Sequence, residues 1–371
     1  MNIVHLIDSI EQVNFGIWNA ATATSTTMNQ MYGARSFVVY GNRETVVPDL
    51  LAESVTETSF ASSPADVSQF LSKHACNSSN AVVVSHGCWR NPTLWGKLLS
   101  KLGFGWVYTP HGMLEPWSMS QGRLKKTVYF SLIEKPAIRK ANFIRAVSSP
   151  EAERLRSKFP NHRVALIPNC VDSPQAEQSQ WAKSGSSNTL FLFLGRLHKK
   201  KCVVPLAKAF ANSALANRTD VELVIAGPDD GELGTLSEVK KKTQTDNLVI
   251  SAPMYGNAKQ EILKRTDFFL LPSQSEGLPT AVLEAMSYGC VPIISSGCNF
   301  PEAFAENLAI EVAPNQSSIK EALGKASEMT SKDRMELARR NMHFVEKHYT
   351  IENVTKMQYE LYQSLLSRSP A

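Results

Sequence analysis

Short apolar runs rich in β-branched and aromatic residues alternate with longer amphipathic stretches along most of the chain. The runs are nearly continuous rather than alternating, which is typical of parallel strands covered by helices on both faces. The strands predicted in the first half are residues 2–8, 36–41, 81–85, 105–109, 142–148 and 164–168. Those predicted in the second half are residues 189–195, 221–227, 247–252, 267–272, 291–295 and 308–312.

Helical periodicity separates these strands. The predicted helices are residues 18–31, 92–102, 122–139, 203–216 and 280–288. After Val312 the pattern is helical only, with helices expected at 318–326, 332–347 and 351–366. Strands that alternate with helices in both halves predict an α/β protein with two doubly wound domains.

The middle of the chain contains a polar, turn-rich segment, Asp172–Asn188, that has no periodicity and is typical of a linker. We therefore expect a first domain at residues 1–171, a linker at 172–188 and a second domain at 189–348. A final helical segment, 349–371, follows. The length of 371 residues suits two domains with full-sized cores.

Composition excludes several classes of protein. With 43% hydrophobic and 20% charged residues, the chain is too apolar to be disordered. Its net charge is +5 (39 basic minus 34 acidic residues) and is too dispersed to indicate a nucleic-acid partner. The six cysteines include no C-x-x-C pair, and the N-terminus lacks the pattern of a secretory signal. We expect a cytoplasmic protein with reduced thiols.

Positive charge is nevertheless concentrated between Trp89 and Arg145, where ten basic residues face only Glu115 and Glu134. Apolar residues are interleaved with them, namely Leu94, Trp95, Leu98, Leu99, Val128, Tyr129, Leu132 and Ile133. This mixture suggests a peripheral contact with an anionic membrane surface, on the inner face of the membrane, or with a lipid-linked diphosphate acceptor. The alternative is a set of core-packing helices with ordinary solvated lysines.

A cationic motif follows the first strand of the second domain. The strand 189–195 leads directly into Gly195-Arg196-Leu197-His198-Lys199-Lys200-Lys201. Ligands of open α/β sheets bind beyond the carboxyl ends of the strands, which is where this motif lies. A guanidinium and an ammonium five residues apart, Arg196 and Lys201, can bind the two phosphates of a diphosphate. A solvated basic loop is the alternative.

A second motif, at residues 275–286, follows the strand 267–272 and opens a helix. The free N–H groups at a helix N-terminus suit a phosphate or sugar oxygen. Glu276 and Glu284 lie eight residues apart and can accept hydrogen bonds from two separate hydroxyl clusters, such as those of a nucleotide sugar. The alternative is that Glu276 interacts only with the helix dipole and that Glu284 is a surface residue.

In this order and spacing, the two motifs resemble those of the retaining glycosyltransferases of family GT4. The similarity covers nearly the whole chain. It lies in Trp106–Trp117, Ile167–Asp172, Phe193–Lys201, Leu223–Gly231 and Glu276–Glu284 with the Ala-Met that follows. The resemblance implies the GT-B fold, in which two Rossmann-like domains face each other across a cleft and the last helix crosses back to the first domain.

The same resemblance assigns the donor site. Arg196 and Lys201 would hold the diphosphate, Glu284 the ribose hydroxyls and Glu276 the hydroxyls of the transferred sugar. Backbone amides of Gly277, Leu278 and Thr280 would cap the sugar or phosphate, whereas Pro279 has no N–H to donate. Gly16, in the loop after the first strand, would lie at the phosphate.

On the acceptor side, the resemblance points to two histidines that follow strand ends. His111 matches the family's cleft histidine, with a role in catalysis or acceptor positioning, and His86 is a further acceptor-binding candidate. The expected catalytic set is therefore His111, Glu276, Arg196 and Lys201.

The chain departs from the family at three positions. The loop 10–18 has Phe15-Gly16 where members commonly have two glycines, and Cys170 and Cys202 stand where glycine is usual. Asp229-Asp230 is not a D-x-D metal motif, so we expect no divalent cation and no cofactor other than the nucleotide-sugar co-substrate.

These features together predict a retaining glycosyltransferase. It would move a sugar from a nucleotide-diphosphate sugar to a hydroxyl of a glycan or lipid-linked acceptor, in surface polysaccharide biosynthesis. Two alternatives remain open: a nucleotide-sugar epimerase of the same fold and a non-catalytic, transferase-like subunit.

Overall fold

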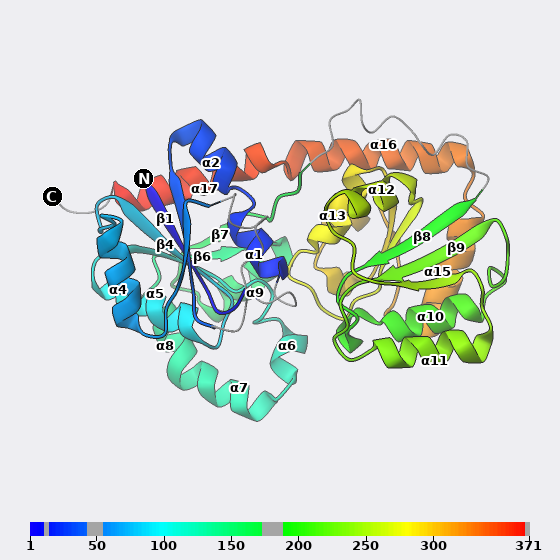
Figure 1. Cartoon of the computed structure of the whole chain (residues 1–371), viewed down its shortest axis with the longest axis horizontal. Helices are drawn as coiled ribbons and strands as arrows, with labels where there is room; N and C mark the ends of the chain where they lie inside the picture. The colour runs from blue at the N-terminus through cyan, green and yellow to red at the C-terminus, as the bar shows by residue number, and fades with distance from the viewer. Residues whose placement is uncertain (11–14, 43–54, 173–187, 368–371) are drawn as a thin grey trace. The chain divides into compact units, whose positions relative to one another are not determined.

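The computed structural model describes residues 1–10, 15–42, 55–172 and 188–367 (Figure 1). Contacts within the chain divide it into two compact units. The first comprises Met1–Cys170 together with Ile351–Ala371, and the second is Val171–Thr350. Most of the linker expected at 172–188 lies outside the described residues.

The first unit is built on a parallel sheet with the strand order β3–β2–β1–β4–β5–β6–β7. The strands are β1 (Asn2–Ile7), β2 (Arg35–Tyr40), β3 (Glu57–Phe60), β4 (Ala81–His86), β5 (Gly105–Thr109), β6 (Phe143–Ala146) and β7 (Val164–Leu166). All except β3 were predicted from the sequence. The strand β3 was missed because it is a half-buried edge strand whose residues are mostly polar.

Both faces of this sheet are buried, as β4 illustrates. Ala81 and Val83 belong to one apolar core, and Val82 and Val84 belong to another on the opposite face. The first core includes residues of α4 (Pro64–Lys73), α5 (Asn91–Lys101), α8 (Lys135–Ile138) and α9 (Ser149–Lys158). The second includes residues of α2 (Ser25–Tyr32) and α17 (Ile351–Leu366). Burial on two faces explains why the strand is continuously apolar.

The last helix, α17, has the bounds that the sequence predicted and packs within the first unit beside α2 (Figure 1). Thr24 Oγ1 donates a hydrogen bond to Gln358 Oε1 at 2.8 Å. The rings of Tyr32 and Tyr359 stack with their centroids 3.7 Å apart. The final helix therefore completes the core of the first unit.

Two of the predicted helices are interrupted. The stretch 18–31 forms α1 (Phe15–Thr22) and α2, because the chain turns between them. The stretch 122–139 forms α7 (Arg123–Tyr129), one turn of π-helix at Phe130–Glu134, and α8, preceded by the short α6 (Pro116–Ser120).

The second unit contains another parallel sheet, with the order β10–β9–β8–β11–β12–β13. Its strands are β8 (Thr189–Leu194), β9 (Val221–Ala226), β10 (Leu248–Ser251), β11 (Phe268–Leu271), β12 (Val291–Ile294) and β13 (Ile310–Glu311). Its helices are α10 (Val203–Ala211), α11 (Leu233–Thr243), α12 (Gly256–Arg265), α13 (Thr280–Ser287), α14 (Pro301–Ala305), α15 (Gln316–Ser327) and α16 (Ser331–His348). The fold is therefore the predicted pair of doubly wound α/β domains.

The strand order reverses once in each sheet, between β1 and β4 in the first unit and between β8 and β11 in the second. Loops leave the two central strands in opposite directions at such a point, and ligands of doubly wound folds bind there. All the strands are parallel, so the loops at their carboxyl ends lie along one edge of each sheet. Within the described residues, no helix combines the length and hydropathy needed to span a bilayer.

Candidate functional site

The cationic motif lies at the point of strand reversal in the second unit. After β8 ends, the loop 195–201 is tied to the loop after β9, because Leu197 N–H donates to Pro228 O at 2.8 Å. A Cβ atom on Gly227 would lie 1.8 Å from Gly195 O, so this close approach requires glycine at position 227. The Gly-Pro turn after β9 therefore supports the loop that carries Arg196.

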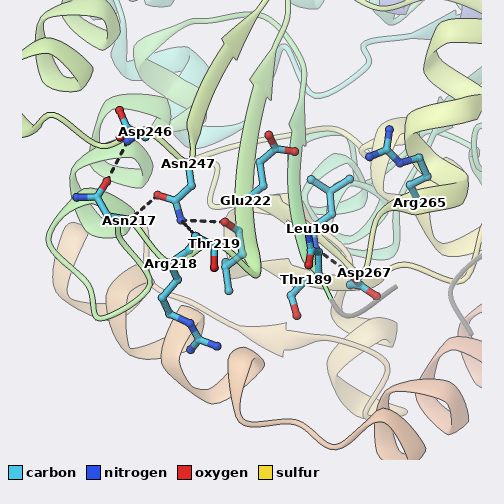
Figure 2. Close-up of a pocket in the computed structure, with 12 residues that line it drawn as sticks. Thr189, Leu190, Asn217, Arg218, Thr219, Glu222, Asp246, Asn247, Arg265 and Asp267 are labelled. Carbon is cyan, nitrogen blue, oxygen red and sulfur yellow. Dashed lines mark hydrogen bonds between the residues drawn. The ribbon is translucent and has the colours of Figure 1, made fainter. Parts of the chain in front are cut away.

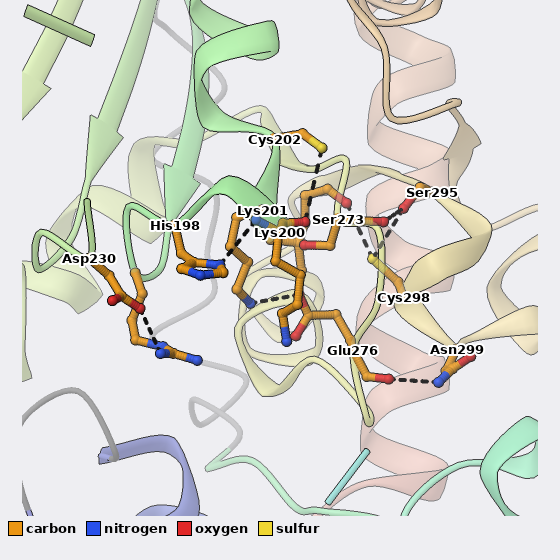
Figure 3. Close-up of polar contacts among 12 residues, drawn as sticks. His198, Lys200, Lys201, Cys202, Asp230, Ser273, Glu276, Ser295, Cys298 and Asn299 are labelled. Carbon is orange, nitrogen blue, oxygen red and sulfur yellow. Dashed lines mark hydrogen bonds and ion pairs between the residues drawn. The ribbon is translucent and has the colours of Figure 1, made fainter. Parts of the chain in front are cut away.

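The loop that carries Glu276 follows β11 and is held by its neighbours on both sides. Glu276 N–H donates to Gly297 O at 2.7 Å, and Asn299 Nδ2 donates to Glu276 O at 2.6 Å (Figure 3). From the loop after β8, Lys200 O accepts a hydrogen bond from Gln274 N–H at 2.8 Å. Hydrogen bonds with the loops after β8 and β12 thus fix the position of the loop that carries Glu276. Nothing in the local sequence pointed to Asn299.

Lys201 and Glu276, which were predicted separately, form an ion pair. Lys201 Nζ lies 2.7 Å from Glu276 Oε1, and their side chains are only 14% and 10% exposed (Figure 3). Burial opposes ionisation of Glu276, but Lys201 and Lys200 outweigh it and hold the pKa of this carboxyl below its ordinary value. Burial lowers the pKa of Lys200, although Glu276 acts in the opposite direction. Two lysines and one carboxylate leave an excess of positive charge at this position.

Arg196 and Glu284 each have a different ionic partner. Arg196 Nη1 lies 2.8 Å from Asp230 Oδ2, and Lys259 Nζ, from α12, lies 2.9 Å from Glu284 Oε1. Both pairs are partly exposed, so they contribute less to stability than the buried pair. Lys259 was not singled out from the sequence, because nothing in the local pattern distinguishes it from a solvated helix residue.

The expected backbone donors lie around the start of α13. Gly277 and Leu278 are in the loop that precedes this helix, and Thr280 is its first residue. The first N–H groups of a helix have no partner within the helix, so they can bind an anion or a hydroxyl. In the first unit, Gly16 lies in the first turn of α1 and is exposed, and a Cβ atom added there would have open space around it. Residues 11–14 of that loop lie outside the described part of the chain.

The two aspartates after β9 have structural partners. Asp229 Oδ1 accepts hydrogen bonds from the N–H groups of Gly231, Glu232 and Leu233, which leads the chain into α11. Asp230 pairs with Arg196. Among the residues that the structure describes, no three His, Cys, Asp or Glu side chains are grouped as metal ligands.

All six cysteines are buried thiols. Cys202 has a φ of 54°, a left-handed conformation that favours glycine. Burial raises the pKa of Cys202 to about 11, which keeps the thiol protonated at neutral pH. Cys170 lies in a small apolar cluster with Ile167 and Val354.

The two predicted histidines of the first unit lie beside the strand reversal and contact each other. His86 ends β4, and His111 follows β5. His86 Nδ1 and His111 Nε2 are 2.9 Å apart, and His86 Nε2 lies 3.0 Å from Nδ1 of His5, in β1. His5 had no signal in the sequence because it lies inside an apolar strand.

Glu151, at the start of α9, holds the turn that follows His111. Its two carboxylate oxygens accept hydrogen bonds from Gly112 N–H at 2.6 Å and Val147 N–H at 2.8 Å. Burial raises the pKa of this carboxyl to about 7, and the two N–H donors oppose that shift. The sequence Ser148-Ser149-Pro150-Glu151 is typical of a helix N-terminus, so a helix that begins here could have been predicted. The contact of Glu151 with the turn after His111 could not, because it joins residues that are distant in the sequence.

A pocket of about 630 Å³ lies at the opposite edge of the second sheet, at the amino ends of β8, β9 and β11 (Figure 2). Its polar groups hold the surrounding loops together: Asn247 Nδ2 donates to Arg218 O and Val221 O, and Asp267 Oδ2 accepts from Leu190 N–H. Ligands of this fold bind at the carboxyl edge, so we assign no ligand to this pocket.

The buried ion pair leads to a prediction about stability. Replacing Lys201 by Met leaves the Glu276 carboxylate buried without this cation and should lower the free energy of unfolding by roughly 3 kcal/mol. The double variant Lys201→Met/Glu276→Gln should recover most of that loss. Denaturant unfolding measures both. The matched change Lys259→Met breaks the partly exposed pair with Glu284 and should cost about 1 kcal/mol or less. A double variant no more stable than Lys201→Met would contradict the prediction.

Glu151 leads to a prediction about pH. The pKa of this carboxyl is raised on folding, so its stabilising contribution is present at low pH and is lost as pH rises through about 7. Between pH 5 and pH 8, the free energy of unfolding of the wild type should fall by roughly 2 kcal/mol more than that of Glu151→Gln, whose amide does not titrate. Denaturant unfolding of both proteins at the two pH values measures this difference. Equal pH dependence in the two proteins would show that Glu151 does not titrate in this range.

Comparison with known proteins gives matches over both units. The profile described as "Glycosyl transferase 4-like domain" matches residues 35–170, and "Glycosyl transferases group 1" matches residues 175–342. The chain is 33% identical over 156 residues to the Escherichia coli "UDP-Gal:alpha-D-GlcNAc-diphosphoundecaprenol alpha-1,3-galactosyltransferase". This alignment covers 39% of each of the two chains. It is 24% identical over 264 residues to one component of the human phosphatidylinositol N-acetylglucosaminyltransferase, covering 70% of this chain and 52% of the relative. These alignments therefore span only two fifths to one half of the relatives' own lengths.

Solved structures extend the similarity to the whole fold. Anabaena HepE in complex with UDP and glucose superposes with a TM-score of 0.75 at 15% identity, over 98% of this chain and 100% of that one. The sucrose-phosphate synthase of Thermosynechococcus elongatus gives a TM-score of 0.75 at 13% identity, over 100% of both chains. At such low identities the likeness concerns the fold alone, which is GT-B. The two family profiles adjoin each other and together span most of the sequence. The chain therefore belongs to the GT4-type glycosyltransferases.

Proposed function

We propose that this protein is a retaining glycosyltransferase. It would transfer a sugar from a nucleotide-diphosphate sugar to a hydroxyl group of a glycan or lipid-linked saccharide. The observation that carries the proposal is the buried contact of Lys201 with Glu276 at the strand reversal, with Arg196 on the same loop as Lys201. Cationic groups, a buried carboxylate and a helix N-terminus come together there.

Donor binding follows from these charges. Arg196 uses one guanidinium nitrogen for Asp230 and retains other N–H donors for a phosphate, and Lys201 supplies an ammonium group. Neutralising the diphosphate as it leaves stabilises the transition state. In this proposal the cations do what a divalent metal does in other transferases, so neither a metal nor a cofactor takes part. Glu276 and Glu284 accept hydrogen bonds from the hydroxyls of the transferred sugar and the ribose.

The transfer step breaks the bond between the anomeric carbon and the diphosphate oxygen. The acceptor hydroxyl attacks the anomeric carbon on the same face, and its proton passes to the leaving phosphate oxygen. Amides of Gly277, Leu278 and Thr280 bind the sugar or phosphate. His111 orients the acceptor hydroxyl, and Gly16 lies near the phosphate in the bound state.

We further propose that the donor is a UDP-sugar and that the acceptor carries a lipid-linked diphosphate. The names of two similar proteins support this choice: the Escherichia coli relative uses UDP-Gal and a diphosphoundecaprenol acceptor, and HepE was solved with UDP. Such an acceptor would place the protein in surface polysaccharide biosynthesis, on the cytoplasmic side of the membrane.

A matched pair of arginine variants tests the donor site. Arg196 and Arg218 each form a partly exposed ion pair with an aspartate, but Arg218 lies at the amino edge of the sheet. Arg196→Gln should lower kcat/KM with a UDP-sugar by about a hundredfold, because it removes charge from the leaving diphosphate. Arg218→Gln should leave it unchanged. Equal rates for the two variants would exclude the proposed donor site.

The same assay separates the two alternatives. The donor is incubated with and without acceptor, and the products are analysed by NMR. Transfer that requires the acceptor and forms a product with the donor's anomeric configuration supports a retaining transferase. A new sugar isomer formed from donor alone would indicate an epimerase, and binding of donor without turnover would indicate a non-catalytic protein. Unchanged rates with a chelator present are expected for a metal-independent enzyme.

The first unit also presents an apolar surface bordered by positive charge. Leu124, Val128, Leu132 and Ile133 are exposed, Leu124 and Leu132 at 79% and 72%, and the first three recur at a helical spacing of four. Arg123, Lys125, Lys126, Lys135, Arg139 and Lys140 lie among them in the sequence. Trp95 and Leu99, by contrast, are buried, so this part of the basic segment belongs to the core. Figure 1 shows α7 at the margin of the first unit, away from its sheet.

We propose that this surface, centred on Leu124 and Leu132, contacts an anionic bilayer. Apolar side chains surrounded by lysine and arginine match the interface of such a membrane in both hydrophobicity and charge. The protein should float with vesicles that contain anionic phospholipid at low salt and should not float with neutral vesicles. The variant Leu124→Ser/Leu132→Ser should lose most of this binding without loss of stability, because both side chains are exposed. Equal flotation of the variant and wild type would exclude this surface.

A further inference from the structure

Three histidines, two from neighbouring strands and one from the loop after the next strand, form a continuous hydrogen-bonded series in the first unit. Resting on the proposed role of His111 in the transferase reaction, we propose that His5 and His86 are positioning residues. They determine which ring nitrogen of His111 carries the proton, so that His111 presents one defined hydrogen-bonding group to the acceptor. This inference goes beyond the proposed function because it includes His5 and changes the role of His86.

The geometry runs from the core to the surface. His5 Nδ1 lies 3.0 Å from His86 Nε2, and His86 Nδ1 lies 2.9 Å from His111 Nε2. Both pairs of ring centroids are 5.2 Å apart. His5 and His86 are 3% and 2% exposed, whereas His111 is partly exposed. The Nδ1 atom of His111 is thus the ring nitrogen at the outer end of the chain.

His86 has both ring nitrogens within hydrogen-bonding distance of another histidine. A buried side chain with this arrangement has no ring nitrogen left for an acceptor sugar. In this proposal His86 does not make the acceptor contact that was expected from the sequence. It acts on the acceptor indirectly, through its hydrogen bond to His111.

Counting protons shows why the rings are coupled. A neutral imidazole carries one N–H, so neutral His86 must donate one hydrogen bond and accept the other. Only two arrangements satisfy both contacts. In the first, His5 donates to His86 and His86 donates to His111, which leaves the proton of His111 on Nδ1. In the second, all the donors are reversed, and Nδ1 of His111 carries a lone pair. The tautomer of His111 is therefore coupled to those of His86 and His5, and the three can change only together.

The surroundings keep the rings neutral. Burial, with the positive charge of Arg145, lowers the pKa of His5 and of His111 to about 3. Burial and the neighbouring histidines lower the pKa of His86 well below its ordinary value. Arg145 is itself buried and fixed, because its guanidinium donates to Ile167 O at 2.9 Å and Pro168 O at 2.7 Å. Arg145 is thus a permanent cation beside the three histidines, and its charge opposes the doubly protonated form of each ring.

The backbone at His111 is constrained as well. His111 has a φ of 51°, which is costly for a residue other than glycine, and Gly112 has a φ of 75°. The bond from Gly112 N–H to Glu151 holds this turn, while His86 holds the ring. A strained residue whose backbone and side chain are both fixed is typical of a pre-organised site.

Variants at His5 distinguish a positioning role from a purely structural one. His5 lies at the buried end of the three hydrogen-bonded histidines, farthest from where the acceptor would bind. His5→Leu removes the inner hydrogen bond and places an apolar side chain at this buried position of the strand. His5→Asn places an amide group near the position of the Nδ1 atom. We expect His5→Leu to lower kcat about tenfold with donor KM unchanged, and His5→Asn to recover most of that loss. His86→Leu should lower kcat about a hundredfold, and the exposed His343→Asn serves as the control.

The second readout is the tautomer itself. Long-range ¹H–¹⁵N correlation spectra of protein labelled in histidine should show one tautomer of His111 in the wild type and in His343→Asn. Both tautomers should be populated in His5→Leu, and His5→Asn should again show one. Spectra in which the ring nitrogens of His111 are identical in the wild type, His5→Leu and His86→Leu would overturn the proposal.

The two readouts distinguish the inference from the function on which it rests. If no sugar donor supports turnover, the proposed function fails, but the spectra still show whether His5 and His86 set the tautomer of His111. If transfer occurs and His111→Ala retains the wild-type rate, the positioning role in catalysis is overturned even where the spectra show coupling.

Discussion

A parallel sheet directs every strand towards the same edge, and this constraint determines where chemistry can occur in both units. Where the strand order reverses, the loops after two central strands diverge and leave room for polar groups. The core beneath is apolar, because each strand is covered on both faces. An ionisable side chain that is buried at this edge must therefore be paired, hydrogen-bonded or neutral.

The two units meet this requirement in different ways. In the second unit, Lys201 and Glu276 remain charged because they face each other at 2.7 Å, and Lys200 leaves an excess of positive charge beside them. In the first unit, His86 and His111 are neutral, since burial and Arg145 disfavour protonation. The first arrangement suits an anionic leaving group, and the second suits a hydroxyl that must be oriented without attracting a counter-ion.

The features that could be predicted are those encoded by local patterns. The bounds of α17 follow from helical periodicity, and all the strands except β3 follow from short apolar runs. The motif residues Arg196, Lys201, Glu276 and Glu284 were found because each set adjoins the end of a predicted strand. The strand β3 was missed because a polar edge strand carries little of the apolar signal used to find the others.

By itself, the sequence determined the alternation of strands and helices, every strand of the two sheets except β3, and the residue types present at each strand end, because these depend on spacing along the chain. Only the tertiary structure decided which of those residues touch. Nothing in the local sequence connects His5 with His86, Glu151 with Gly112, or Lys259 with Glu284, which lie 81, 39 and 25 residues apart. Such contacts depend on strand order and loop packing, and these bring distant residues together only when the sheets form.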